Sequence, residues 1–163
     1  MRHAIDKGLR IVLVGLMGAL VLNVVWQVFS RYVLQSPSIF TDELARFLLI
    51  WVSLLGAAYY SGQNMHIAID LFPRWLSEQN RNLHHIITSG LIILFVLTVF
   101  VIGGSYLVFT TYTYTQITPA LQIPIAVVYM VGPLSGLLII YYKLSDIRKC
   151  LLSDSAETST SNE

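Results

Sequence analysis

Charge and cysteine are what this chain has least of. Only 12% of its 163 residues are charged, and its one cysteine, Cys150, excludes an internal disulfide framework and a paired-cysteine metal site. The chain has neither a Walker-type glycine loop nor an HExxH sequence, so nucleotide hydrolysis and zinc-protease activity are not indicated. No two histidines stand in the middle of an apolar run, where haem ligation would need them. We therefore expect no enzyme activity, catalytic residue, metal, cofactor or nucleic-acid partner for this chain.

Long uncharged runs are what the chain has instead, in a composition that is 55% hydrophobic. A helix needs about 20 apolar residues to cross a bilayer. No segment alternates apolar and polar residues as a barrel strand would, so helices are the expected spanning elements. The third and fourth runs are separated by a polar break at 111–119. We predict an all-α integral membrane protein with one four-helix domain, residues 1–150, and transmembrane helices at about 11–30, 44–62, 86–109 and 123–142.

The positive charges predict the orientation of these helices. Of the ten lysines and arginines, all but Arg31 and Arg46 fall before the first span, between the second and third, or after the fourth. The positive-inside rule then places both termini in the cytoplasm and loops 32–42 and 112–122 outside. The first run is longer than a signal-peptide core and no clean small-x-small site follows it, so we expect a retained helix. Residues 151–163, which are mostly small or acidic, predict a disordered cytoplasmic tail.

The connection between the second and third spans has its own pattern. Apolar residues recur at helical spacing over about 71–84, and polar residues cover the other side. Such a segment is typical of an amphipathic helix in the cytoplasmic interface, with Trp75 at headgroup depth. The alternative is that these residues extend the third span into water.

Small residues predict where the helices approach closely. Gly132 and Gly136 form a small-xxx-small face on the fourth span, and Ser53 and Ala57 do so on the second. These faces suit packing within the four-helix unit or against a partner, and the spacing alone leaves both open. Pro124 and Pro133 predict the start of the fourth span and a kink within it.

A rare cluster of charge stands at the start of the second span. Asp42 and Glu43 fit the positive end of a helix dipole, with Thr41 as a candidate N-cap. Arg46 lies four residues after Asp42, close enough for a local ion pair. Taken alone, this cluster fits ordinary helix-end chemistry.

Several short motifs in order resemble a known family. Arg31-Tyr32, the block Phe40-Thr-Asp-Glu-Leu-Ala-Arg46, Trp51, Gly56-Ala-Ala and His66-Ile-Ala-Ile-Asp70 are similar to the small membrane subunit (DctQ-like) of tripartite ATP-independent periplasmic (TRAP) transporters. The resemblance covers about residues 10–149. Many members have tryptophan where Phe40 stands, which keeps an interfacial ring.

The resemblance implies a role within a transport complex of the bacterial inner membrane. In this family a soluble periplasmic protein delivers an organic acid, such as sialic acid or a C4-dicarboxylate, to a large membrane subunit. That large subunit holds the substrate and sodium sites and moves as an elevator. The small subunit is expected to widen the static scaffold and to help dock the binding protein. Its expected partners are the large subunit, the binding protein and membrane lipids, with both termini cytoplasmic.

Three groups of residues are the candidates for scaffold or partner contacts, and none is expected to bind substrate or ion. One group should fix the outer end of the second span, one should pack helices together, and one should pin the inner end of the second span to the interfacial helix. The full set is Arg31, Asp42, Glu43, Arg46, Trp51, Gly56, His66, Asp70, Trp75, Gly132 and Gly136.

Two other classes of protein compete with this interpretation. A self-sufficient oligomeric carrier or channel would need a functional carboxylate within a span, and Glu43 lies at an end. A membrane anchor subunit of a redox enzyme would bind haem or quinone. Neither class accounts for the block between Phe40 and Asp70.

Overall fold

The computed structural model describes residues 2–36, 38–63 and 78–160, with side chains placed over 5–36, 38–63 and 87–148. His66, Asp70 and Trp75 lie outside the described residues, so the hypothesis that they anchor the second span stays a prediction. The described chain is helical, without a named strand. Its elements are α1 (Arg2–Tyr32), α2 (Ile39–Gln63), α4 (Glu78–Val96), the π-helix η2 (Leu97–Gly103), α5 (Gly104–Thr113), α6 (Ile125–Tyr129) and α7 (Val131–Thr160).

Four helices of the described chain are long and apolar enough to cross a membrane, which confirms the predicted fold class. We call them spans one to four in chain order; the first two extend past both predicted ends, and the last two extend past their predicted C-terminal ends. They are Ile5–Tyr32, Ile39–Gln63, Ile87–Thr113 and Ile125–Arg148.

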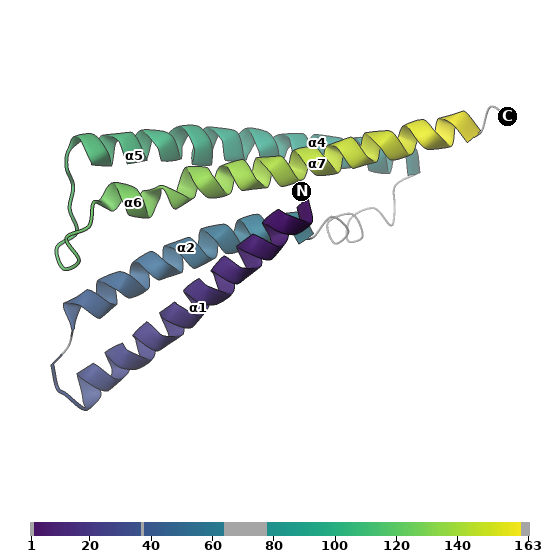
Figure 1. Cartoon of the computed structure of the whole chain (residues 1–163). Coiled ribbons are helices and arrows are strands. Elements are labelled where there is room, and N and C mark those ends of the chain that lie inside the picture. The colour runs from purple at the N-terminus through teal and green to yellow at the C-terminus, as the bar shows by residue number, and fades with distance from the viewer. Residues whose placement is uncertain (1, 37, 64–77, 161–163) are drawn as a thin grey trace.

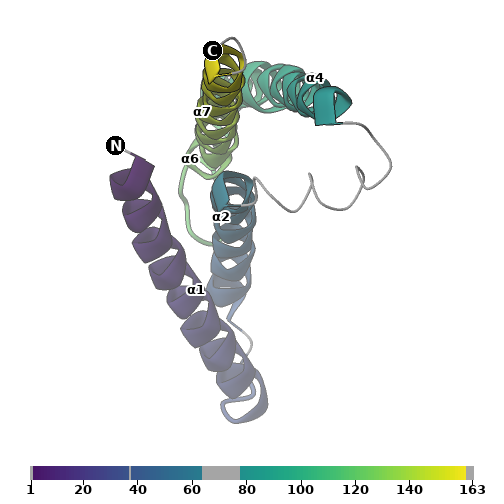
Figure 2. The same ribbon diagram turned by 90° about the vertical axis from the view of Figure 1, so that its right-hand side faces the viewer.

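The spans form a row in the order one, two, four, three. Span one packs on span two, span two on span four, and span four on span three. Figures 1 and 2 show the two antiparallel helix pairs that result, with α2 and α7 in the middle of the row and α1 at one edge. Buried apolar side chains are therefore few and lie mostly along the central contacts, as for Leu55, Ala58 and Val131. Large apolar side chains elsewhere are exposed, as suits helices that face lipid.

Along the helix axes, the two ends of this four-helix unit differ in which parts of the chain they contain. Loops 33–38 and 114–124 lie at one end, which we call the loop end. The described ends of α1 and α7 lie toward the other, which we call the terminal end (Figure 1). This arrangement follows because successive spans run in opposite directions, so that the loop after span one and the loop after span three lie at the same end.

Spans three and four are each irregular at mid-length. Span three widens into the π-helix η2, whose last residue, Gly103, is followed by a second glycine. Span four is interrupted at Met130, between α6 and α7. Pro133 has no N–H to donate to the carbonyl of Tyr129, four residues earlier, which explains the break. Pro124 is the N-cap of α6, so the predicted start of span four is confirmed.

The start of span two differs from its sequence-based prediction. The helix begins at Ile39 rather than at Leu44, so Thr41 lies in its first turn and is not the N-cap. The Thr41 hydroxyl instead donates to the backbone carbonyl of Ser38, at 2.8 Å. Ile39 and Phe40 continue the apolar pattern outward, which lets the helix start a turn earlier.

Two further predictions differ from the described backbone. Residues 78–84, assigned to an interfacial helix over 71–84, run without a break into span three as part of α4; residues 71–77 lie outside the described residues. The tail predicted to be disordered continues α7 as helix to Thr160. Residues 151–160 contain neither proline nor glycine, so nothing in them stops a helix that already has many turns.

Candidate functional site

The strongest polar tie at the loop end joins span two to the loop between spans three and four. Oε2 of Glu43 accepts hydrogen bonds from the backbone N–H groups of Ala120, at 2.9 Å, and Leu121, at 3.0 Å. The carboxylate is half-buried. Because hydrogen bonds to a charged acceptor are stronger than neutral ones, this pair holds a loop that lies 77 and 78 residues further along the chain.

The loop that Glu43 holds is itself closed by hydrogen bonds. Two hydrogen bonds join Thr118 and Ile123: the Thr118 N–H donates to the Ile123 carbonyl at 3.0 Å, and the Ile123 N–H donates to the Thr118 side-chain hydroxyl at 3.1 Å. The Ile125 N–H donates to the carbonyl of Gln116 at 3.0 Å. Gln122 turns the chain with a φ of 54°, in the left-handed region. Span four therefore starts from a fixed loop.

Asp42 joins span two to span one and to its own next turn. Its Oδ2 lies 2.5 Å from Nη2 of Arg46, which confirms the ion pair expected from the spacing. Its Oδ1 accepts from the Gln27 amide on α1 at 3.2 Å. The Arg46 side chain is 73% exposed, so the ion pair with Asp42 contributes little to stability in water.

Polar side chains of span one that sequence reasoning missed add hydrogen bonds to span two and to the loop before it. The Asn23 amide donates to the backbone carbonyl of Thr41 at 2.7 Å, and the Ser30 hydroxyl donates to the carbonyl of Ser36 at 2.7 Å. Asn23, Gln27 and Ser30 are spaced by four and three residues, which puts them on one face of a helix. This spacing of polar residues within an otherwise apolar run is the sequence signal that could have predicted a contact face on span one.

The other candidate residues of span two do not contact a neighbouring helix in the same way. Trp51 and Gly56 are half-buried, and a Cβ placed at Gly56 would meet nothing within 4 Å. Ser53 and Ala57 of the predicted small-xxx-small face are exposed. This face of span two is therefore not used for close packing among the described residues.

Close packing of spans three and four depends on two glycines. A Cβ at Gly136 would lie 2.9 Å from the Cβ of Phe100, and a Cβ at Gly104 would lie 3.0 Å from Cδ of Pro133. A Cβ at Gly132 would meet nothing within 4 Å. Of the small-xxx-small pair predicted on span four, only Gly136 therefore marks a close approach.

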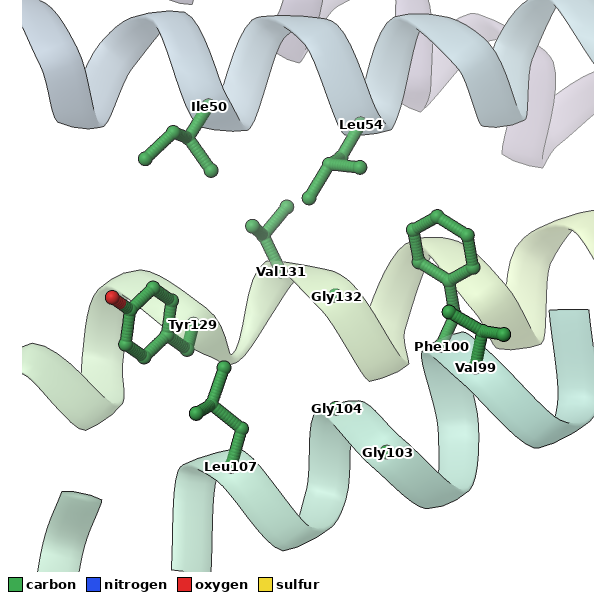
Figure 3. A pocket seen from close by; sticks show the side chains of 10 residues that line it. All are labelled: Ile50, Leu54, Val99, Phe100, Gly103, Gly104, Leu107, Tyr129, Val131 and Gly132. Atoms are coloured by element: carbon green, nitrogen blue, oxygen red, sulfur yellow. The ribbon is translucent and has the colours of Figure 1, made fainter. Parts of the chain in front are cut away.

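Gly132 instead borders an apolar cavity of about 240 Å³ between spans two, three and four. Figure 3 shows the cavity below Ile50 and Leu54 of α2, with the break in span four and the glycines of span three facing it. The remaining lining residues are Val99, Phe100, Gly103, Gly104, Leu107, Tyr129 and Val131. The π-helix and the break thus face each other across space that no side chain fills.

A third polar contact lies at the terminal end and joins the first span of the chain to the fourth. The hydroxyl of Tyr142, on α7, donates to Oδ1 of Asp6, on α1, at 2.5 Å. The Tyr142 ring is fully buried and lies over span two, so close that a Cβ at Gly62 would be 2.9 Å from it. Asp146, one turn further along α7, is also buried. Sequence reasoning missed Asp6, Tyr142 and Asp146, because no local pattern connects the first turn of the chain with its fourth span.

Arg31 lies at the loop end with its guanidinium exposed. Its Cζ is 5.9 Å from the ring centroid of the adjacent Tyr32, within the range of a weak cation–π contact. Within the described ranges, no group of three or more histidine, cysteine, aspartate or glutamate side chains could hold a metal ion.

These contacts define a multi-pass helical membrane subunit whose polar ties fix loops and helix ends. A model of the DctQ component of tripartite ATP-independent periplasmic transporters matches residues 20–152. The chain belongs to this family and is the small permease subunit of a TRAP transporter rather than an enzyme.

Three curated proteins show how far the similarity extends. The chain is 35% identical over 81 residues to the sialic acid TRAP transporter small permease protein SiaQ of Vibrio cholerae, covering 50% of this chain and 47% of that protein. It is 24% identical over 137 residues to a protein of Haemophilus influenzae provisionally assigned as a TRAP transporter small permease, covering 84% and 83%. It is 29% identical over 141 residues to the isethionate TRAP transporter permease protein DctMQ of Oleidesulfovibrio alaskensis, covering 83% and 22%. The chain thus spans about half of the first of these relatives and under a quarter of the third.

Proposed function

We propose that this chain is a static scaffold in a sodium-coupled TRAP transporter, beside a large subunit that carries the substrate and ion sites. The single row of spans is the observation that carries the proposal. A row has two broad apolar faces and is held by ties at its loops and helix ends. Such a unit suits the task of extending another protein's surface within the bilayer, because helices in lipid associate by close packing rather than by expelling water.

The partner in this proposal is the large TRAP membrane subunit. In the isethionate relative, the region similar to this chain occupies 22% of a longer permease chain, which supports a partner that is joined to it there. The exposed small residues Ser53 and Ala57, with Gly56 between them, offer one place for close approach. Gly56 and Trp51 keep their predicted role as contacts to other helices under this proposal.

The proposed orientation puts the loop end outside the bacterial inner membrane and both termini in the cytoplasm. The positive-inside pattern supports it, because Arg31 and Arg46 are the two basic residues at the loop end. The loop held by Glu43 would then face the periplasm, where a solute-binding protein could dock. The names of the relatives favour an organic acid as solute, with sialic acid and isethionate both represented.

Uptake by the reconstituted complex tests the proposed function. The large subunit and binding protein are placed in proteoliposomes with and without this chain, and uptake of labelled sialic acid, a C4-dicarboxylate and isethionate is measured under a sodium gradient. We expect uptake only with this chain present, and none from this chain alone. Transport by this chain alone would favour an oligomeric carrier, and haem or quinone in the purified chain would favour a redox anchor.

A matched pair of variants tests the contact surface. Ala57→Trp places a large ring on the exposed face of span two, and Ala19→Trp does the same on span one, where Ala19 is also exposed. We expect Ala57→Trp to prevent copurification with the large subunit and Ala19→Trp to allow it. Copurification of both variants at wild-type yield would place the contact elsewhere.

A further inference from the structure

A second cavity, of about 460 Å³, lies at the loop end between spans one and two. It is lined by Gln27 and Arg31 of α1, by Ser38, and by Ile39 and Asp42 of α2. Four of its five lining residues carry polar or charged groups, unlike the lining of the cavity in Figure 3, and apolar parts of these residues line the rest. Glu43, which holds the loop before span four, is not among its lining residues, so the cavity is separate from that tie.

Arg31 and Asp42 carry opposite charges in this cavity, and they differ in their hydrogen-bond and ion-pair partners. Among the described residues, the exposed guanidinium of Arg31 makes no hydrogen bond or ion pair, and it lies near the Tyr32 ring. Asp42 accepts from Gln27 and Arg46, yet its side chain is 50% exposed. A carboxylate offers about four acceptor positions, so Asp42 retains room for another donor.

The place of the cavity in the fold limits which ligand can reach it. Arg31 directly follows the uncharged run of span one, and Asp42 lies in the first turn of span two. The cavity is therefore level with the ends of the hydrocarbon core, where lipid headgroups lie. Ile39, which is 74% exposed, provides an apolar side to the same cavity.

We propose that this cavity binds the headgroup of a zwitterionic phospholipid that carries a primary ammonium group. The phosphate diester accepts hydrogen bonds from the guanidinium of Arg31 and the hydroxyl of Ser38. A guanidinium is suited to two parallel hydrogen bonds with phosphate oxygens. The ammonium donates to Asp42, and an acyl chain runs past Ile39. A headgroup with both charges matches both ends of the cavity, whereas free phosphate matches only Arg31. This binding does not depend on transport.

Native mass spectrometry of the purified complex with its large subunit tests this proposal. The complex is titrated separately with phosphatidylethanolamine, phosphatidylcholine, phosphatidylglycerol and inorganic phosphate. Phosphatidylcholine keeps a positive charge without N–H donors, and phosphatidylglycerol keeps the phosphate without a cation. We expect phosphatidylethanolamine to bind about tenfold more tightly than either, since a hydrogen bond to a charged group contributes about that factor.

Two variants and one control assign the contacts. Arg31→Gln should weaken binding of all three lipids about tenfold, because it removes the cation that meets the phosphate. Asp42→Asn should reduce phosphatidylethanolamine binding to the level of phosphatidylglycerol. Arg46→Gln removes the other basic side chain at this end, which does not line the cavity, and should not weaken lipid binding.

Three results would overturn the proposal. Equal binding of the three lipids to wild type and Arg31→Gln would show that the cavity selects no headgroup. Displacement of the lipid by inorganic phosphate at equal concentration would show a general anion site. If Arg31→Gln left lipid binding intact but weakened association with the solute-binding protein, the cavity would be a protein contact instead.

Discussion

Spans one and four are both apolar enough to cross a membrane, yet they are held in place by different means. In its most hydropathic window, 33% of span four is buried, whereas none of span one is. Span four lies between two neighbours and meets them through Gly136 and the Tyr142 ring. Span one lies at the edge of the row and is joined by hydrogen bonds of Asn23, Gln27 and Asp6. Hydropathy alone therefore does not tell which helix is central.

Of these contacts, those in the middle of span four should tolerate substitution least. Gly136→Ala places a Cβ 2.9 Å from the Cβ of Phe100, so the backbones of spans three and four must separate. We expect a loss of about 3 kcal/mol in the free energy of unfolding, the upper part of the range for overpacked contacts. Unfolding followed by steric trapping in micelles measures it. Gly132→Ala, whose Cβ would meet nothing within 4 Å, is the matched control and should cost little. Equal effects of the two variants would contradict the assigned contact.

The loop that leads into span four should be the next most sensitive feature. Glu43→Ala removes the acceptor of two backbone N–H groups. A hydrogen bond to a charged group contributes about 1.5–3 kcal/mol net, and water can partly replace the acceptor at a half-buried loop, so we expect the free energy of unfolding to fall by about 2 kcal/mol. Hydrogen exchange at Ala120 and Leu121 should accelerate correspondingly. Asp42→Ala serves as control, since Asp42 does not bond this loop. Unchanged exchange in the Glu43 variant would show that the loop is held by its own bonds.

Tyr142 both packs its ring and donates a hydrogen bond, and Tyr142→Phe separates the two contributions. The variant keeps the ring against Gly62 and removes the hydrogen bond to Asp6. We expect the free energy of unfolding to fall by about 1 kcal/mol, which is typical of one hydrogen bond. The distance distribution between a spin label at the start of α1 and one at the end of α7 should broaden. Spans two and four should keep their separation in a second labelled pair. Broadening in both pairs would mean that the hydroxyl also supports the central contact.

Asn23→Leu should have the smallest effect, and it tests the edge position of span one. Leucine fits lipid as well as the neighbouring residues do, so only the bond to the Thr41 carbonyl is lost. Hydrogen bonds between membrane helices contribute about 0.6 kcal/mol on average. Crosslinking yield between cysteines placed on spans one and two should fall slightly while the stability of spans two to four is unchanged. A loss above 2 kcal/mol would show that span one is integral to the row.

Local signals predicted much of the fold but less of the contacts. The ion pair of Asp42 and Arg46 follows from their spacing on one helix, and the start of span four follows from the backbone restriction of Pro124; the structure confirms both. The Glu43 tie to Ala120 could not be predicted, because its partners are backbone groups far along the chain. The π-helix in span three was missed for a related reason, since its sequence is a continuous apolar run.

The sequence by itself determined that four helices cross the membrane and that two short loops share one end, because run length and chain alternation fix both. Only the tertiary structure decided the order one, two, four, three. All four runs are compatible with lipid, so hydrophobicity does not rank their pairings. Close approach does, and it depends on which glycine lies opposite which side chain, as Gly136 lies opposite Phe100 and Gly62 opposite Tyr142.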